Sequence, residues 1–173
     1  SAVPQMLQNL PKDVSQAMVN PMAPALATAI RFSRGQALRR GTQPIPPEIK
    51  AELSSYFPAT ILESTSWTTA GGISIDGALK NWFNQEGGIT YDDVVVFAST
   101  GHAQDVALWA HELTHVLQYR QMGVESFAFL YSVNWNQLES QASQNSERIV
   151  ASINATSQGR PQTWGYAGKL AAP

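Results

Sequence analysis

Two histidines and a glutamate stand in the spacing that many zinc hydrolases use. The stretch Trp109-Ala-His-Glu-Leu-Thr-His-Val-Leu-Gln118 contains the pattern H-E-x-x-H. In a helix of about 3.6 residues per turn, His111 and His115 lie on one face, so their ring nitrogens can converge on one tetrahedral metal ion. Glu112 then lies beside the metal as a general base. These residues predict a Zn²⁺ centre that supports hydrolysis.

The residues around the motif predict an amphipathic helix. The two histidines point away from its apolar stripe, so metal ligands explain them better than core histidines satisfied by hydrogen bonds. Ser99 or Thr100 can cap the start of this helix, and Gly123 follows its expected end. The stripe comprises Val106, Trp109, Ala110, Leu113 and Leu117.

A zinc site needs a third protein ligand, and the residues in and just before the motif helix do not readily supply it. A metzincin would place Gly and a third His where Gln118 and Gln121 stand, so that class is excluded. His102 lies at or before the start of the motif helix, on the side of the apolar stripe. We expect His102 to be a capping or substrate-side residue.

The third ligand is expected on a second helix over residues 134–149. Glu139 borders the apolar stripe of this helix, whereas Glu147 falls about half a turn away, on the solvent side. Glu139 also follows His115 by 24 residues, which lets the chain return beside the first helix. We therefore predict Glu139 as the ligand; the alternative is a solvated carboxylate favoured by the helix dipole. The stripe comprises Leu138, Ala142, Ile149 and Ile153.

Hydrolysis also needs a donor that stabilises the oxyanion. The sequence offers Tyr131 and His102 as candidates, and we assign Tyr131 a catalytic role. Trp135 and Tyr119 are candidates for the wall of a specificity pocket, although aromatic residues at such spacing more often belong to a core.

Four segments resemble, in this order, the bacterial eCIS core domain, a family named for its association with extracellular contractile injection systems. The resemblance implies a zinc metallopeptidase with His111, His115 and Glu139 as ligands and Glu112 as catalyst. The family usually carries an acidic residue four positions after the ligand Glu, where this chain has Ser143, so a carboxylate that would support His111 or His115 is missing. The segments are Ile45–Leu53, Val94–Ala98, Leu108–Gln118 and Leu138–Ala142.

Composition agrees with one compact domain. The chain has 173 residues, of which 43% are hydrophobic, enough for one core. A formal net charge of −2 argues against nucleic-acid binding, no apolar run is long enough to span a membrane, and the absence of cysteine excludes disulfides and thiolate ligands. Ser1 in place of Met suits a trimmed secretory product, so we expect a secreted or extracytoplasmic protein. We also expect a monomer.

We expect an α+β, zincin-like fold, in which a small mixed sheet packs on the H-E-x-x-H helix with further helices. Residues 1–43 form an N-terminal helical extension, 44–160 the metallopeptidase domain and 161–173 a tail. Strand Val94–Ala98 is either a sheet edge, to which a peptide can add, or an interior core strand. Helices are expected at Asp13–Val19, Pro24–Arg40, Glu48–Tyr56 and Ala78–Gln85, and a further strand at Gly71–Gly77.

Metal-assisted hydrolysis of a peptide or protein substrate is therefore the favoured function. The alternative is a zincin-like docking module of a secretion or toxin assembly, with a structural metal or none. A third interpretation, a peptidoglycan-cleaving hydrolase, differs only in its substrate. An open fourth coordination position favours an enzyme, and a fourth protein ligand favours the module.

Overall fold

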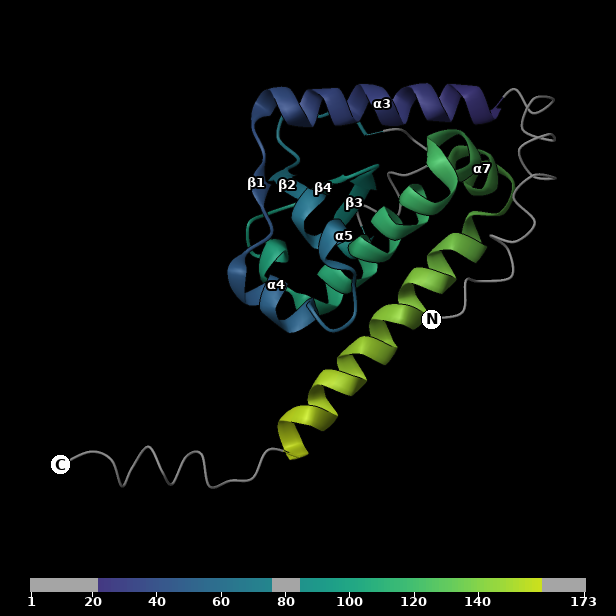
Figure 1. The fold of residues 1–173 in the computed structure, drawn as a ribbon. Helices are drawn as coiled ribbons and strands as arrows, with labels where there is room; N and C mark the ends of the chain where they lie inside the picture. Colours follow the sequence, from purple (N-terminus) through teal and green to yellow (C-terminus); the bar gives the residue numbers. More distant parts are fainter. Residues whose placement is uncertain (1–21, 76–84, 160–173) are drawn as a thin grey trace.

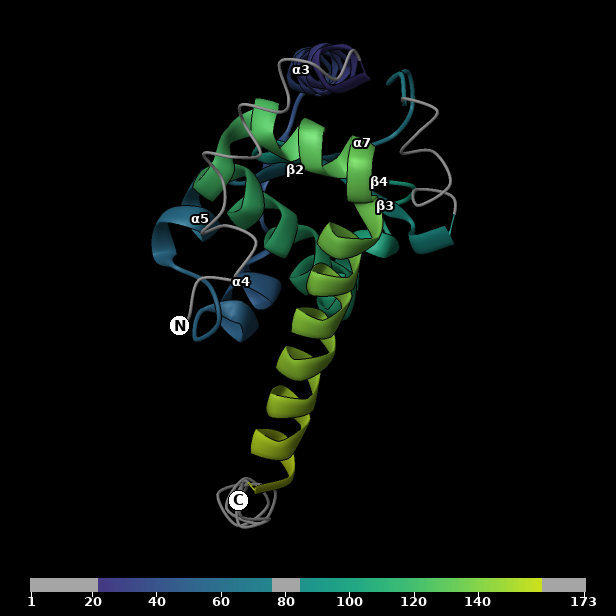
Figure 2. The same cartoon turned by 90° about the vertical axis from the view of Figure 1, so that its right-hand side faces the viewer.

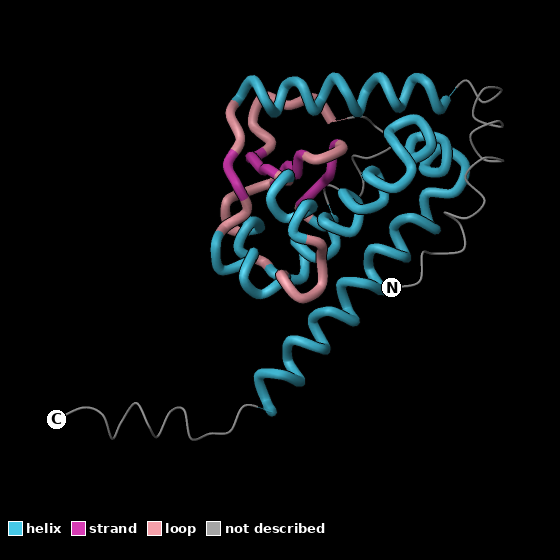
Figure 3. Tube along the Cα trace, in the orientation of Figure 1, coloured by secondary structure: helices cyan, strands magenta, loops and turns pink. Residues whose placement is uncertain are grey.

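The computed structural model describes residues 22–75 and 85–159 of the chain. This part is a mixed α+β fold, mostly helical, with one small sheet (Figure 3). The general class is therefore as predicted. The elements are α3 (Met22–Arg40), β1 (Gln43–Pro44), α4 (Pro47–Leu53), α5 (Ala59–Ser64), β2 (Ser66–Thr69), β3 (Gly88–Tyr91), β4 (Val94–Phe97), the 3₁₀ helix η1 (His102–Gln104) and α7 (Val106–Gly159).

The sheet has four strands in the order β1-β2-β4-β3. Strand β4 runs parallel to β2 and antiparallel to β3, and all four of its residues are buried. The apolar run Val94–Phe97 is therefore an interior strand, which confirms the core alternative and shows that the edge-strand alternative was wrong. Strand β3 is the edge strand beside it. Its sequence, Gly-Ile-Thr-Tyr, does not by itself indicate a strand, because it is short and begins with glycine.

Helix α7 consists of three helical segments, over residues 106–122, 124–133 and 135–159. Gly123 separates the first two with a φ of 82°, a conformation that favours glycine, and Asn134 separates the last two. The predicted end of the motif helix at Gly123 is thus confirmed. Its predicted cap is wrong, because the helix begins at Val106 and the Asp105 carboxylate accepts the backbone N–H groups of Ala107 and Leu108.

The third segment of α7 returns beside the first and then extends away from the sheet (Figures 1 and 2). Several hydrogen bonds link these segments; among them, Asn145 Nδ2 donates to Thr114 Oγ1 at 2.9 Å, and Ser146 Oγ donates to the backbone oxygen of Ala107 at 2.6 Å. Segments far apart in sequence are therefore held together where His111 and Glu139 must meet.

Helix α3 lies across the other end of the molecule (Figure 1). Its apolar side shares a core with β3, β4 and α7, and its Arg34 forms an ion pair with Asp93 in the β3–β4 turn at 2.7 Å. Helix α3 confirms the helix predicted at Pro24–Arg40. Helix α4 confirms the start of the one predicted at Glu48–Tyr56, opened by Pro47 as expected, but it ends at Leu53.

The remaining predicted helices and strands are either wrong or lie outside the described residues. Residues 71–75 form a turn and irregular chain, so the strand expected there is wrong over that part. Residues 13–19 and 78–84, expected to be helical, lie outside the described residues. No helix in the described ranges is long and apolar enough to cross a membrane.

Candidate metal centre

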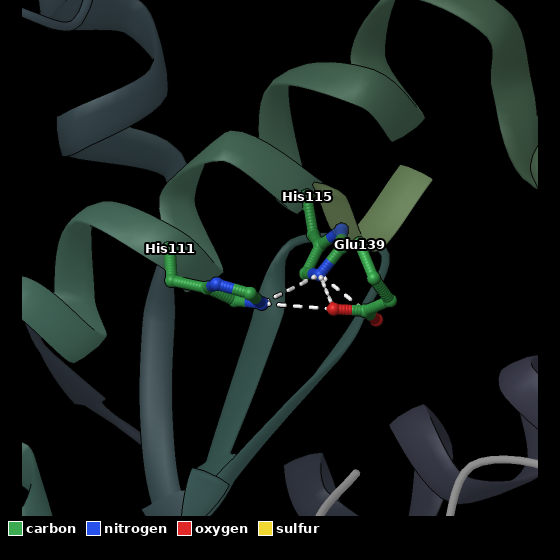
Figure 4. Close-up of side chains that lie close together, drawn as sticks. All are labelled: His111, His115 and Glu139. Atoms are coloured by element: carbon green, nitrogen blue, oxygen red, sulfur yellow. Dashed lines mark hydrogen bonds and ion pairs between the residues drawn. The ribbon is translucent and has the colours of Figure 1, made fainter. Parts of the chain in front are cut away.

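Three side chains converge where the first and third segments of α7 meet (Figure 4). His111 Nε2 lies 2.9 Å and His115 Nε2 lies 3.2 Å from Glu139 Oε2, and the two Nε2 atoms are 3.2 Å apart. His111 and His115 come from successive turns of one helix, and Glu139 comes from the segment that follows the break at Asn134. The structure thus brings together the three predicted ligands.

The helical phase of the third segment aims Glu139 inward. Its neighbours Leu138 and Ala142 are fully buried, and Glu139 itself is only 5% exposed. Glu147, on the same segment, is exposed. The alternative of Glu139 as a solvated helix carboxylate is therefore wrong, and the expected difference between the two glutamates is confirmed.

The donor set suits a divalent transition-metal ion. Two imidazole nitrogens and one carboxylate oxygen lie within 4.8 Å of one another, and within the described ranges no fourth His, Cys, Asp or Glu joins the group. Three protein donors without a fourth are the pattern of an open coordination site. Beside them is a cavity of about 20 Å³, lined by Glu86, Gly88, Ile89, His111, Glu112, His115, Tyr131 and Glu139.

Glu112 lies at the same cavity and is held by the edge strand. Thr90 Oγ1 on β3 donates to Glu112 Oε2 at 2.6 Å, while Glu112 Oε1 faces Gly88, where an added Cβ would stand only 3.2 Å from it. Burial raises the pKa of Glu112, against the opposing effects of His111, His115 and the Thr90 hydrogen bond. A buried carboxylate with a raised pKa and one oriented oxygen is suited to accept a proton.

Two further side chains contact the outer nitrogens of the histidines. Gln118 Oε1 lies 2.7 Å from His115 Nδ1, and Ser143 Oγ lies 3.4 Å from His111 Nδ1. The family resemblance left open whether position 143 supports His111 or His115, and the structure places it at His111, with a hydroxyl in place of a carboxylate. Sequence reasoning missed the partner roles of Gln118 and Thr90. The spacing of three residues after His115 indicates Gln118, whereas no local pattern indicates Thr90.

Of the other residues predicted to act at the site, Tyr131 lies at the cavity, whereas His102, Trp135 and Tyr119 do not line it. Tyr131 is buried at the cavity and its hydroxyl donates to Glu139 Oε1 at 3.1 Å. His102 is exposed in η1, bonded through Nδ1 to Ser99, and is not among the cavity-lining residues. Trp135 is 43% exposed, and Tyr119 is a core residue stacked on Phe127. Neither Trp135 nor Tyr119 lines the cavity.

In the absence of a metal, His115 carries an extra proton and faces the carboxylate of Glu139. Burial lowers the pKa of His115, but the charge of Glu139 and the hydrogen bond to it raise the pKa to about 9. Burial also favours the neutral form of Glu139, yet His115 and His111 hold the pKa of this carboxyl well below its usual range. Near neutral pH, the metal-free site is therefore an imidazolium facing a carboxylate.

This charge state predicts a pH dependence of metal affinity. Because a metal must displace the proton on His115, its apparent affinity should rise about tenfold per pH unit from about pH 7 and level off near pH 9. Titration with Zn²⁺ across this range, corrected for buffer binding, measures the slope. Glu139→Gln should flatten it, since the amide no longer raises the His115 pKa. An affinity of the wild-type protein that stays constant over the range would contradict this charge state.

Comparison with models of known protein families found one match. The eCIS core domain matches residues 85–123, which contain β3, β4, η1 and the first segment of α7. This match includes Glu112 and the two histidines but not Glu139, and it is shorter than the resemblance noted from the four sequence segments. Neither the curated proteins nor the solved structures gave a significant match.

Proposed function

We propose that this protein is a zinc-dependent metallopeptidase of the gluzincin type, with Glu112 as its general base. The observation that carries the proposal is the shared cavity. The oriented carboxylate of Glu112 and the three donors His111, His115 and Glu139 all line it. A sheet that places its edge strand beside the H-E-x-x-H helix also agrees with a zincin-like fold.

Each side chain then has a defined task. Zn²⁺, when bound, supplies Lewis acidity and lowers the pKa of water to about 7. Glu112 takes a proton from the attacking water through Oε1, since Thr90 holds Oε2, and passes this proton to the leaving amine. Tyr131 orients Glu139 through its hydroxyl, and its oxyanion role requires that hydroxyl to turn from Glu139 to the substrate.

The edge strand provides a place for the substrate backbone. Strand β3 is the outer strand of the sheet beside β4, and its Gly88 and Ile89 line the cavity. An extended peptide that adds to this edge lies across the metal centre. We therefore propose a peptide or protein substrate, and the association of the eCIS core domain with injection systems favours a protein that acts outside the cytoplasm.

The competing proposal is a docking module of a secretion assembly. The small cavity and the burial of the ligands, each no more than 6% exposed, favour it, because a structural metal needs no access for substrate. The three-donor set favours the enzyme, because structural zinc sites are closed by a fourth protein ligand.

A cleavage assay separates the two. Zinc-restored protein is incubated with a mixed peptide library and with peptidoglycan, and the products are identified by mass spectrometry. We expect metal-dependent cleavage of peptides, abolished by a chelator, restored by Zn²⁺ and absent in His115→Ala. Cleavage of peptidoglycan alone would change the substrate class. No cleavage by protein that carries a full equivalent of zinc would favour the docking module.

A further inference from the structure

Gln118 is a buried amide between the two ligand-bearing segments of α7. It is 2% exposed and lies three residues after His115. Its Oε1 is 2.7 Å from His115 Nδ1, and its Nε2 lies 3.3 Å from the backbone oxygen of Leu138 and 2.7 Å from Gln141 Oε1. The Gln118 side chain therefore contacts His115 on the first segment of α7 and Leu138, the residue immediately before Glu139, on the third segment.

These contacts determine which end of the amide faces His115. The backbone oxygen of Leu138 can only accept a hydrogen bond, so the atom that faces it must be the NH₂ group of Gln118. The Gln118 carbonyl oxygen then faces His115 and can only accept. His115 Nδ1 must consequently carry a hydrogen, which leaves the lone pair of the neutral ring on Nε2, the atom that faces His111 and Glu139.

We propose that Gln118 is a positioning residue that sets the tautomer and ring orientation of His115 for metal binding. The orientation of its amide is itself imposed by the segment that carries Glu139, so docking of that segment and preparation of His115 are coupled. The proposal rests on the metal centre of the proposed function but not on hydrolysis, because metal affinity alone tests it.

The test compares two variants on the same helix. Gln118→Leu keeps a similar volume and removes the acceptor, and we expect its Zn²⁺ affinity to fall roughly 10- to 100-fold. Gln121→Leu, an exposed position one turn further along, is the matched control and should bind as the wild type does. Competition with a chromogenic chelator at fixed pH gives the affinities, and circular dichroism verifies the fold of each variant. Wild-type affinity in Gln118→Leu would overturn the proposal.

A third variant tests the hydrogen-bond acceptor of Gln118 separately from its NH₂ donors. Gln118→Glu retains an oxygen that accepts from His115 Nδ1 but loses the donors to Leu138 and Gln141. We expect its Zn²⁺ affinity to stay clearly above that of Gln118→Leu. Equal losses in the two variants would show that the acceptor is not what matters, and would overturn the assigned role.

The tautomer can also be observed in the wild-type protein, which covers the case in which Gln118→Leu does not fold. In zinc-loaded protein labelled with ¹⁵N-histidine, NMR should show a proton on His115 Nδ1 that exchanges slowly with solvent, because Gln118 holds it in a buried hydrogen bond. A spectrum with the proton on Nε2 would overturn the proposal. A correct tautomer in a protein that cleaves no peptide would leave this inference intact and remove only the enzymatic function.

Discussion

Zinc-loaded Glu112→Gln is expected to keep its metal and its fold while losing hydrolysis by roughly 10²- to 10⁴-fold. The amide has nearly the shape of the carboxylate and can still accept from Thr90, but it cannot take a proton from water. Burial disfavours the charge of Glu112, as its raised pKa shows, so in the metal-free protein the neutral amide should leave the thermal midpoint unchanged or higher. Initial rates on the best library peptide and zinc content by mass spectrometry are the measurements.

The matched control for this variant is Glu63→Gln, which removes an exposed carboxylate on α5, away from the cavity. Its rate should equal that of the wild type. Full turnover by Glu112→Gln with zinc bound would assign the proton transfer to another residue. A loss of zinc together with activity would indicate that Glu112 supports the metal rather than the reaction.

Glu139→Gln is expected to weaken Zn²⁺ binding by about 100-fold or more, since a neutral amide oxygen replaces a carboxylate as a direct ligand. It also replaces one of the two carboxylate oxygens, which face the Tyr131 hydroxyl and the two histidines, with an NH₂ group that cannot accept a hydrogen bond. The same exchange at Glu147, two turns further along the same helical segment and exposed, should leave the affinity within about twofold. Chelator competition on the pair measures the difference.

If Glu147→Gln lost the metal while Glu139→Gln kept it, the ligand would have to be moved two turns along the helix. Similar losses in both variants would instead indicate a general effect of charge near the site. Only the asymmetric result supports Glu139 as the third ligand.

The sequence was sufficient to predict which side chains form the candidate metal centre, because helical periodicity is local. His111 and His115 share a face by their spacing, and the apolar neighbours of Glu139 indicate that it points inward, 5% exposed, while Glu147 points outward. Gly123 also marks the end of the motif helix through its need for a positive φ. Each of these features depends on residues within a few positions of one another.

Other features were missed, misplaced or left open, most of them because they depend on tertiary contacts. Thr90 reaches Glu112 across 22 residues of sequence, and no periodicity relates a strand residue to a helix residue at that distance. The motif helix starts after Asp105 rather than after Ser99 or Thr100 because a short 3₁₀ turn intervenes. Strand β4 is apolar at every position, so only its pairing with β2 and β3 shows that it is interior.

If the three donors hold zinc as we propose, they leave one coordination position for water or substrate. Crystals of zinc-loaded protein, with diffraction data recorded on both sides of the zinc absorption edge, test it most directly. We expect one strong anomalous peak bound by the Nε2 atoms of His111 and His115 and by a carboxylate oxygen of Glu139, with the fourth position not occupied by a protein side chain. A peak away from these donors, or one closed by a fourth side chain, would contradict it.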